Sequence, residues 1–150
     1  PQIEAQGDYY LLSGILLNLS NLEMYTNRLD EALSLVDEAG EIFQSLGIKS
    51  GLAESYNYRG IACYYKELFQ EAYDNYSKAA SFFKEIHEKE KLCHCYINLA
   101  EVCLNLDKPE ESRKWFNEGL KSFPVAENPG LKESYDSVAE AMRQYIASHS

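Results

Sequence analysis

The feature that most constrains the fold of this chain is an internal repeat with a period of 40 residues. Ala32, Ala72 and Ser112 follow one another at this spacing. The same offset aligns small residues with small ones and large residues with large ones: Ser20, Gly60 and Ala100; Ala39, Ala79 and Gly119; Val36, Tyr76 and Phe116; Phe43, Phe83 and Phe123. A period of this length is typical of proteins built from stacked supersecondary units.

Each repeat unit contains two stretches with the hydrophobic spacing of an amphipathic helix. In the middle unit, Ala72, Tyr76, Ala79 and Phe83 fall on one helical stripe, and residues 66–69 before them predict a tight turn. Each unit is therefore expected to be a pair of antiparallel helices. One pair cannot bury both of its faces, so neighbouring pairs must stack.

The predicted fold is all-α, a solenoid of three helix pairs followed by a C-terminal capping or half-repeat helix. The repeats are expected at about 7–48, 49–88 and 89–128, within a single domain over 1–150. The predicted helices cover about 7–26, 29–46, 51–67, 70–88, 90–106, 109–122 and 131–147. The chain begins with Pro1 and not with Met, as expected for a piece of a longer protein.

Composition and charge exclude several classes of function. The chain has Lys+Arg 14 against Asp+Glu 24 and a formal net charge of -10, without a basic cluster. Nucleic acids and anionic membrane surfaces are recognised by clustered Lys and Arg, so neither is an expected partner. The sequence also lacks an uninterrupted apolar run of the length needed to span a membrane.

The cysteines do not predict a metal site. Cys93 and Cys95 flank His94, but residues two apart on a helix point to opposite sides, and the usual spacing of zinc ligands is absent. We interpret the four cysteines as buried, reduced thiols, which favours a cytoplasmic location. The sequence also lacks the common nucleotide-binding, metalloprotease and hydrolase motifs, so we expect neither a cofactor nor an enzyme.

The repeated residues resemble the tetratricopeptide repeat (TPR) family. The middle unit carries the pattern as Tyr56, Arg59-Gly60, Phe69, Ala72, Tyr76 and Ala79. The 40-residue period resembles a long-repeat subtype, which has longer helices than the ordinary repeat of about 34 residues. Three positions depart from the pattern, because Arg59 replaces a leucine, Glu23 replaces a large apolar residue and Pro109 replaces an aromatic one.

The resemblance implies a right-handed solenoid whose first helices line a concave groove that binds a protein or peptide. The residues expected to face this groove are Leu17, Asn18, Asn21 and Tyr25 in the first unit; Glu54, Asn57, Tyr58, Ile61 and Tyr65 in the second; and His94, Ile97, Asn98, Glu101 and Asn105 in the third. Glu133, Asp136 and Glu140 of the last helix are expected beside them.

The chemistry of these residues suggests a basic or neutral peptide ligand. Asparagine amides both donate and accept hydrogen bonds and can hold a peptide backbone, and tyrosine adds a broad apolar surface with a polar tip. One TPR subclass grips chaperone C-terminal carboxylates with a Lys/Arg/Asn clamp, and of the corresponding positions here only Asn21 agrees. The alternative interpretation is that this face is merely the solvated side of the helices.

Two classes of function follow from the resemblance. The first is an adaptor or scaffold that binds proteins or peptides. The alternative is a ligand-sensing regulatory segment of a larger signalling protein, such as a kinase, a cyclase or a transcription regulator.

The helix predicted over 7–26 is apolar around most of its circumference. A helix of this kind is expected to be covered on all sides, and its own unit can cover only part of it. An upstream repeat, a second copy of the chain or a ligand could cover the remainder.

Overall fold

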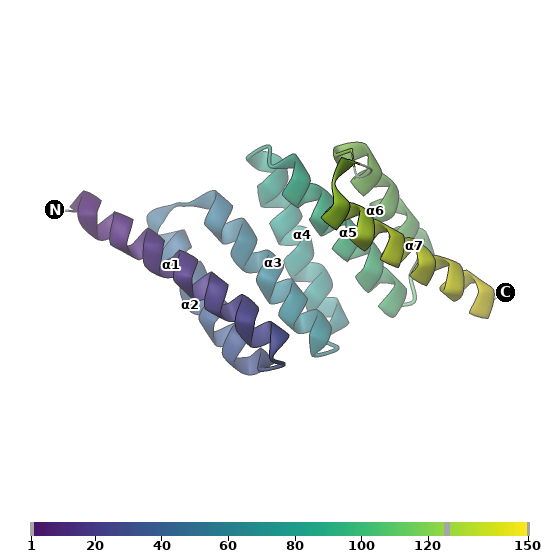
Figure 1. Ribbon diagram of the computed structural model, residues 1–150, viewed down its shortest axis with the longest axis horizontal. Helices are drawn as coiled ribbons and strands as arrows, with labels where there is room; N and C mark the ends of the chain where they lie inside the picture. The colour runs from purple at the N-terminus through teal and green to yellow at the C-terminus, as the bar shows by residue number, and fades with distance from the viewer. Residues whose placement is uncertain (1, 125–126, 150) are drawn as a thin grey trace. The chain divides into compact units, whose positions relative to one another are not determined.

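The computed structural model describes residues 2–124 and 127–149, with side chains from residue 7 onward. Within these residues the chain is all-α, without strands. Its helices are α1 (Gln2–Tyr25), α2 (Leu29–Leu46), α3 (Lys49–Tyr65), α4 (Phe69–Glu85), α5 (Lys89–Asn105), α6 (Pro109–Ser122) and α7 (Pro129–Ser148) (Figure 1). The predicted fold class is confirmed, and α2 and α6 begin and end where the sequence predicts. Helix α1 begins earlier than predicted, and α4 ends three residues before the predicted 88.

The turns between the helices repeat with the same period as the side chains. A residue in the left-handed conformation follows α1, α3 and α5 at Asn27, Glu67 and Asp107, and follows α2 and α4 at Gly47 and His87. In every case its N–H bonds to the carbonyl three residues back, and the next N–H bonds to the carbonyl five residues back, as in Glu67 to Tyr64 and Leu68 to Cys63. This pair of bonds is the Schellman motif, which satisfies the last carbonyls of a helix.

The chain divides into two compact units, Pro1–Phe82 and Phe83–Ser150. In the first unit α1 packs on α2 and α3, and α2 packs on α3. Aromatic pairs join α3 to α4, with ring centroids 5.8 Å apart for Tyr56 and Phe82. In the second unit α5 packs on both α6 and α7. The single domain and its repeat bounds stay predictions.

The side chains at the repeated positions form the core of each unit. Ala32, Ala39, Ala72 and Ala79 are fully buried, and Phe43 and Phe83 are 3% and 2% exposed. Phe123 at the same position of the third repeat is only half-buried. The steric role predicted for each repeated position therefore applies to the alanines and to the first two phenylalanines.

Glycine permits the close approach of α3 and α4. A Cβ atom built on Gly60 would lie 2.6 Å from Cδ1 of Tyr76, whose side chain is only 3% exposed. The ring of Tyr76 thus occupies the space in which any other residue at position 60 would place its side chain. The aligned positions in the other two repeats hold Ser20 and Ala100, which are also small.

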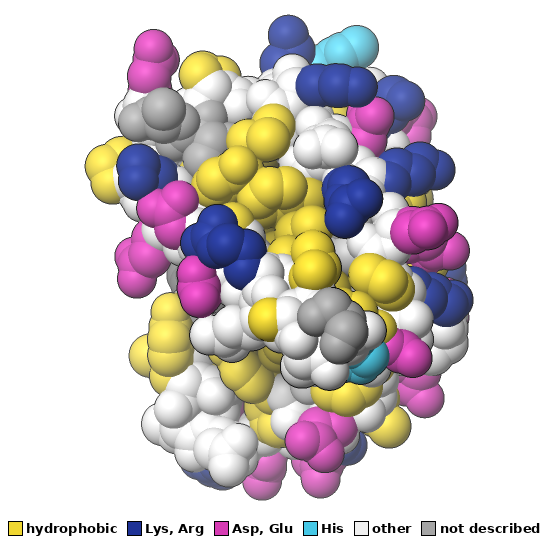
Figure 2. Space-filling view, turned by 90° about the vertical axis from the view of Figure 1, so that its right-hand side faces the viewer, with side chains coloured by type: hydrophobic (Ala, Val, Ile, Leu, Met, Phe, Trp, Pro, Cys, Tyr) yellow, Lys and Arg dark blue, Asp and Glu magenta, His cyan; other side chains and the backbone are white. Residues whose placement is uncertain are grey.

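In the second unit, α7 covers part of α5 and α6. Leu131 and Val138 of α7 join a buried cluster with Ile97 and Phe116, and the ring of Tyr135 stacks on Phe116 with centroids 4.3 Å apart. Figure 2 shows the face on the α7 side, where hydrophobic side chains gather in a strip with charged groups on both sides. Helix α7 therefore completes the core of its unit, as a capping helix does.

Candidate functional site

Helices α1 and α3 lie side by side in the first unit and present equivalent repeat positions to a common cavity. Its volume is about 180 Å³, and it is lined by Asn21, Met24 and Tyr25 of α1 with Ile61 and Tyr65 of α3. Asn21 and Ile61 are 40 residues apart, as are Tyr25 and Tyr65. Four of the five lining residues are thus among those that the sequence assigned to the groove.

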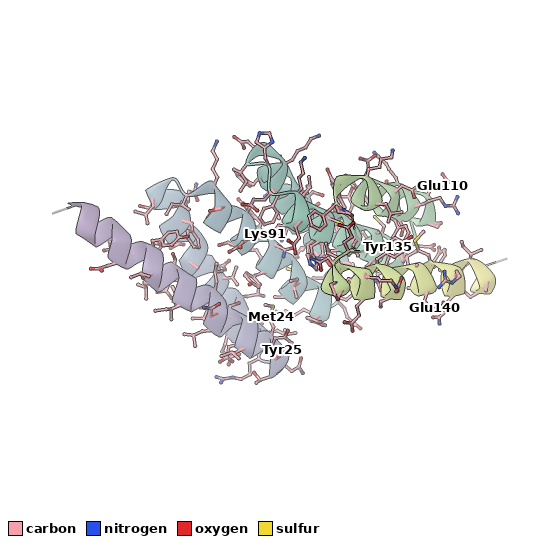
Figure 3. The ribbon with its side chains drawn as sticks, turned by 45° about the horizontal axis from the view of Figure 1, so that its top comes forward. Met24, Tyr25, Lys91, Glu110, Tyr135 and Glu140 are labelled. Atoms are coloured by element: carbon pink, nitrogen blue, oxygen red, sulfur yellow. The ribbon has the colours of Figure 1, made fainter. Side chains whose placement is uncertain are left out.

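The cavity has an apolar floor and an aromatic rim. Met24 is 9% exposed and belongs to a buried cluster with Ala32 and Ala62, against which Ile61 packs. Tyr25 and Tyr65, by contrast, are 81% and 61% exposed. Figure 3 shows Met24 and Tyr25 together at the C-terminal end of α1. An apolar group could therefore enter between two tyrosines whose hydroxyls reach solvent.

The other predicted groove residues on α1 and α3 differ in their exposure. Asn18 is exposed, whereas Glu54, Asn57 and Tyr58 are half-buried. Tyr58 packs against both hydrophobic clusters of the unit, so much of its ring serves the core.

Two of the predicted groove residues do not reach the surface. Leu17 is 4% exposed and packs with Leu16, Ala39 and Phe43, and Ile97 is 2% exposed in the cluster of α5, α6 and α7. Leu17 and Ile97 therefore pack in the core of their units in this structure, and their contact with a ligand stays a prediction. Asn57 occupies the same repeat position and is half-buried, so this position changes its role from one repeat to the next.

The groove residues predicted in the third repeat lie along α5. His94, Asn98 and Glu101 are half-buried, and Asn105 is exposed. The side-chain amide of Asn105 donates a hydrogen bond to the main-chain carbonyl of Glu101 at 3.1 Å, so one of the hydrogen-bond donors of Asn105 is used within the helix. Burial lowers the pKa of His94, and the nearby charge of Glu90 opposes this shift. The burial therefore favours the neutral imidazole of His94, which can donate one hydrogen bond and accept another.

The acidic residues of α7 are partly neutralised by their own helix. Asp136 pairs with Lys132 at 2.8 Å, and Glu140 pairs with Arg143 at 2.7 Å. In Figure 3, Tyr135 and Glu140 both belong to α7, but Tyr135 packs in the core while Glu140 is exposed. Because exposed pairs of this kind cancel much of their field, Glu133 contributes most to the acidity of this helix.

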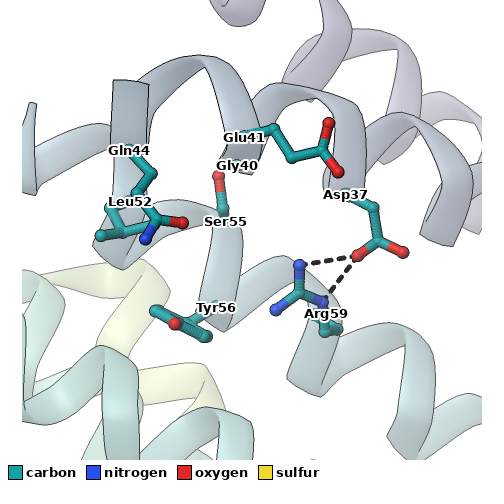
Figure 4. Close-up of a pocket in the computed structure, with 8 residues that line it drawn as sticks. All are labelled: Asp37, Gly40, Glu41, Gln44, Leu52, Ser55, Tyr56 and Arg59. Carbon is teal, nitrogen blue, oxygen red and sulfur yellow. Dashed lines mark hydrogen bonds and ion pairs between the residues drawn. The ribbon is translucent and has the colours of Figure 1, made fainter. Parts of the chain in front are cut away.

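A second cavity, of about 230 Å³, lies between α2 and α3 and was not predicted. It is lined by Asp37, Gly40, Glu41, Gln44, Leu52, Ser55, Tyr56 and Arg59. Nε of Arg59 donates a hydrogen bond to Oδ1 of Asp37 at 2.8 Å, and its guanidinium carbon lies 5.4 Å from the centroid of the Tyr56 ring (Figure 4). The departure of Arg59 from the family pattern was the sequence signal for this cavity.

The cysteines show no arrangement suited to metal binding or nucleophilic chemistry. All four are free and buried, and burial raises the pKa of Cys93 and Cys103 to about 11 and that of Cys95 to about 12. Among the residues that the structure describes, no three His, Cys, Asp or Glu side chains gather as a metal site. Within that same part of the chain, no helix combines the length and the apolarity required to cross a bilayer.

Helix pairs that recur every 40 residues, with a lined cavity between successive first helices, define a helical-repeat protein of the kind that binds other proteins. Residues 51–124 match the family model of the tetratricopeptide repeat, so this part of the chain is identified as a tetratricopeptide-repeat segment. The curated proteins contain no significant match to the sequence.

Solved structures with the same fold share little sequence with this chain. The N-terminal domain of stress-induced protein-1 (STI-1) from C. elegans is 15% identical with a TM-score of 0.67, and the match covers 87% of this chain and 97% of that domain. BtubC (BKLC) from P. vanneervenii is 16% identical with a TM-score of 0.68, over 93% of this chain and 65% of that protein. YrrB, described as a TPR protein with an unusual peptide-binding site, is 20% identical with a TM-score of 0.59, over 88% and 64%. This chain thus spans less than two thirds of BtubC and YrrB.

Proposed function

We propose that this chain is an adaptor or scaffold that binds a peptide segment of a partner protein through the exposed faces of α1 and α3. The observation that carries the proposal is the cavity between α1 and α3, because residues at equal repeat positions line it: Asn21 with Ile61, and Tyr25 with Tyr65. The TPR class supports the proposal, since TPR domains generally act as interaction modules.

The cavity suits one apolar side chain of an extended peptide. Its volume of about 180 Å³ is that of a single medium-sized group, and its floor is formed by Met24 and Ile61. Asn21 at its edge could bond to the peptide backbone on either side of that group, because an amide both donates and accepts. Tyrosines are favoured at binding sites for the same combination of area and polarity that Tyr25 and Tyr65 offer here.

The charge of the chain favours a basic or neutral ligand over an acidic one. Glu54 on α3 and Glu101 on α5 lie on the faces predicted to bind, and the net charge of -10 repels acidic segments at a distance. Neither carboxylate needs to pair with the ligand directly, because the field of the whole chain acts on its approach.

A titration with designed peptides tests both the site and the sign of its charge. Fluorescently labelled peptides of alternating leucine and lysine, and of alternating leucine and glutamate, would be titrated with the chain and followed by anisotropy. We expect the lysine peptide to bind more tightly and to weaken as salt is added. Tighter binding of the glutamate peptide would contradict the charge assignment.

Variants locate the binding residues. Asn21→Ala and Tyr65→Ala should each weaken binding at least about fivefold, near the 1 kcal/mol that marks a significant interface residue. The matched control is Asn117→Ala on α6, which is exposed and outside the predicted groove. Asn57→Ala combined with Asn98→Ala tests two further amides that the sequence predicts on the binding face. Affinity that is unchanged in all of these variants would show that the peptide binds elsewhere.

A further inference from the structure

One side of α1 is apolar and faces no other helix of its unit. The exposed side chains on it are Leu11, Leu12, Ile15, Leu19, Leu22 and Tyr25, with exposed fractions between 42% and 81%. Figure 1 shows α1 at the edge of the first unit. We call these six residues, together with the exposed Asn18 between them, the α1 stripe.

The area of the α1 stripe is that of a stable protein interface. A free side chain of this size exposes about 200 Å², so the six apolar residues together expose roughly 700 Å². A standard interface buries about 800 Å² on each partner, and the largest apolar patch of an ordinary monomer is about 300–600 Å². The stripe therefore exceeds what a single soluble chain usually leaves in water.

The spacing of the stripe is the same when it is read in either direction. Leu11, Ile15, Asn18 and Leu22 follow one another at intervals of four, three and four residues. If two copies of α1 pack in antiparallel orientation about a two-fold axis, Leu11 of one copy meets Leu22 of the other, and Ile15 meets Asn18. Each of these two contacts then occurs twice, once on either side of the two-fold axis, as a closed dimer requires.

The contact surface proposed here carries no charge of its own. Two molecules with a net charge of -10 repel each other at a distance, and an uncharged surface adds no further repulsion at close range. The segment from Leu11 to Leu22 contains no charged residue.

The stripe differs from the surface on which one repeat packs against the next. In the second repeat the positions of Leu11, Ile15 and Leu22 are held by Gly51, Ser55 and Ala62, which are buried. A Cβ on Gly51 would lie 2.1 Å from the ring of Phe43, so α2 and α3 approach closely because the residue there is small. The α1 stripe carries larger side chains at these positions than the second repeat, so a helix that packs on it lies at a wider spacing.

We propose that the chain forms a homodimer through the α1 stripe, with the two α1 helices antiparallel. Tyr25 belongs both to the α1 stripe and to the rim of the peptide cavity, so the dimer is tested at Leu11 and Leu22, which do not line that cavity.

Charge substitutions at Leu11 and Leu22 test both the dimer and its orientation. Both residues are strongly exposed, at 65% and 59%, so the fold should survive their replacement, as circular dichroism would verify. We expect sedimentation velocity to show a dimer for the unmodified chain and a monomer for Leu11→Lys with Leu22→Lys, in which like charges meet. Leu11→Lys with Leu22→Glu should restore the dimer, because each lysine then faces a glutamate of the other copy.

The control is Leu120→Lys on α6, which is also exposed and should leave the dimer unchanged. A folded but monomeric Lys/Glu variant would overturn the antiparallel register. An unmodified chain that stays monomeric at about 100 μM, far above the Kd of a stable dimer, would overturn the proposal.

Discussion

The hydroxyl of Ser112 donates a hydrogen bond to the main-chain carbonyl of Ala100 at 2.6 Å, in the buried contact between α6 and α5. The first repeat has the same bond with the donor on the other helix, since the hydroxyl of Ser20 on α1 donates to the carbonyl of Ala32 on α2 at 3.2 Å. Ser20 aligns with Ala100, and Ala32 aligns with Ser112. The middle repeat has Gly60 and Ala72 at these positions and forms no such bond.

We therefore expect Ser112→Ala to destabilise the chain by about 1 kcal/mol, the usual net value of a buried hydrogen bond. The measurement is the free energy of unfolding from urea denaturation. The control Ser81→Ala replaces an exposed serine of α4 and should be neutral or slightly stabilising, because alanine favours the helix. Equal effects of the two substitutions would show that the bond contributes nothing.

Gly60→Ala should destabilise the chain by about 1–3 kcal/mol, as overpacking of a core does. The added methyl group would lie 2.6 Å from the ring of Tyr76, which is too buried to move aside. Gly14→Ala is the matched control, because the space around Gly14 is open to 4 Å. This control should stabilise the chain by about 0.5–1 kcal/mol through helix propensity. Thermal unfolding of both variants would compare them, and a stabilised Gly60→Ala chain would contradict the close packing of α3 and α4.

Glu67→Gly should stabilise the chain by about 0.5–1 kcal/mol. Glu67 has a φ of 62°, a left-handed conformation that is costly for residues with a side chain and natural for glycine. The equivalent turn after α2 already has Gly47, with a φ of 70°. As a control, Glu71→Gly places the same change inside α4 and should destabilise by up to about 1 kcal/mol. Urea denaturation distinguishes these outcomes, and a loss of stability at position 67 would refute the argument.

The stability of the chain should depend on the protonation of His94. Because burial lowers the pKa of His94, the unfolded chain takes up the proton first as the pH falls. The contribution of the neutral imidazole is fully present above the unfolded pKa of about 6.5 and is lost as the pH falls from there towards the lower folded pKa. His94→Gln should therefore lose less stability than the natural chain between pH 7.5 and 5.5, as measured by urea denaturation. Parallel curves for the two chains would contradict this assignment.

The four cysteines should be unreactive in the folded chain. All of them are buried, and the pKa of Cys95 is raised to about 12, so the thiolate is scarce and inaccessible at pH 8. Reaction with a disulfide reagent should be slow before unfolding and rapid after addition of denaturant, when all four thiols react. Immediate reaction of the native chain would show that at least one thiol is accessible.

The helical architecture could be predicted from the sequence because the same hydrophobic pattern occurs in every repeat. The pattern of a single helix, such as residues 29–46, is ambiguous in isolation, but the recurrence of Ala32, Ala72 and Ser112 identifies the buried side of each second helix. The turns were less predictable, because Asn27, Glu67 and Asp107 adopt the same backbone conformation with different side chains. Their conformation is set by the hydrogen bonds that end the helix and not by residue type.

The candidate site was predicted only in part. Asn21, Tyr25, Ile61 and Tyr65 lie together because residues at equal repeat positions on adjacent helices must be neighbours. The burial of Leu17 and Ile97 could not be foreseen, because it depends on how far each helix is rotated against its neighbours. The cavity at Arg59 was missed for a related reason, since its ion pair joins residues of two helices that share no repeat position.

The helix pairs end in the same hydrogen-bonded turn, at Gly47 and again at His87, so the forty residues from one turn to the next contain all the hydrogen bonds of their own turns. Duplication or deletion of these forty residues would leave the hydrogen bonds of the remaining turns intact. A gene encoding such a chain could therefore gain or lose whole repeats by recombination without a new type of turn.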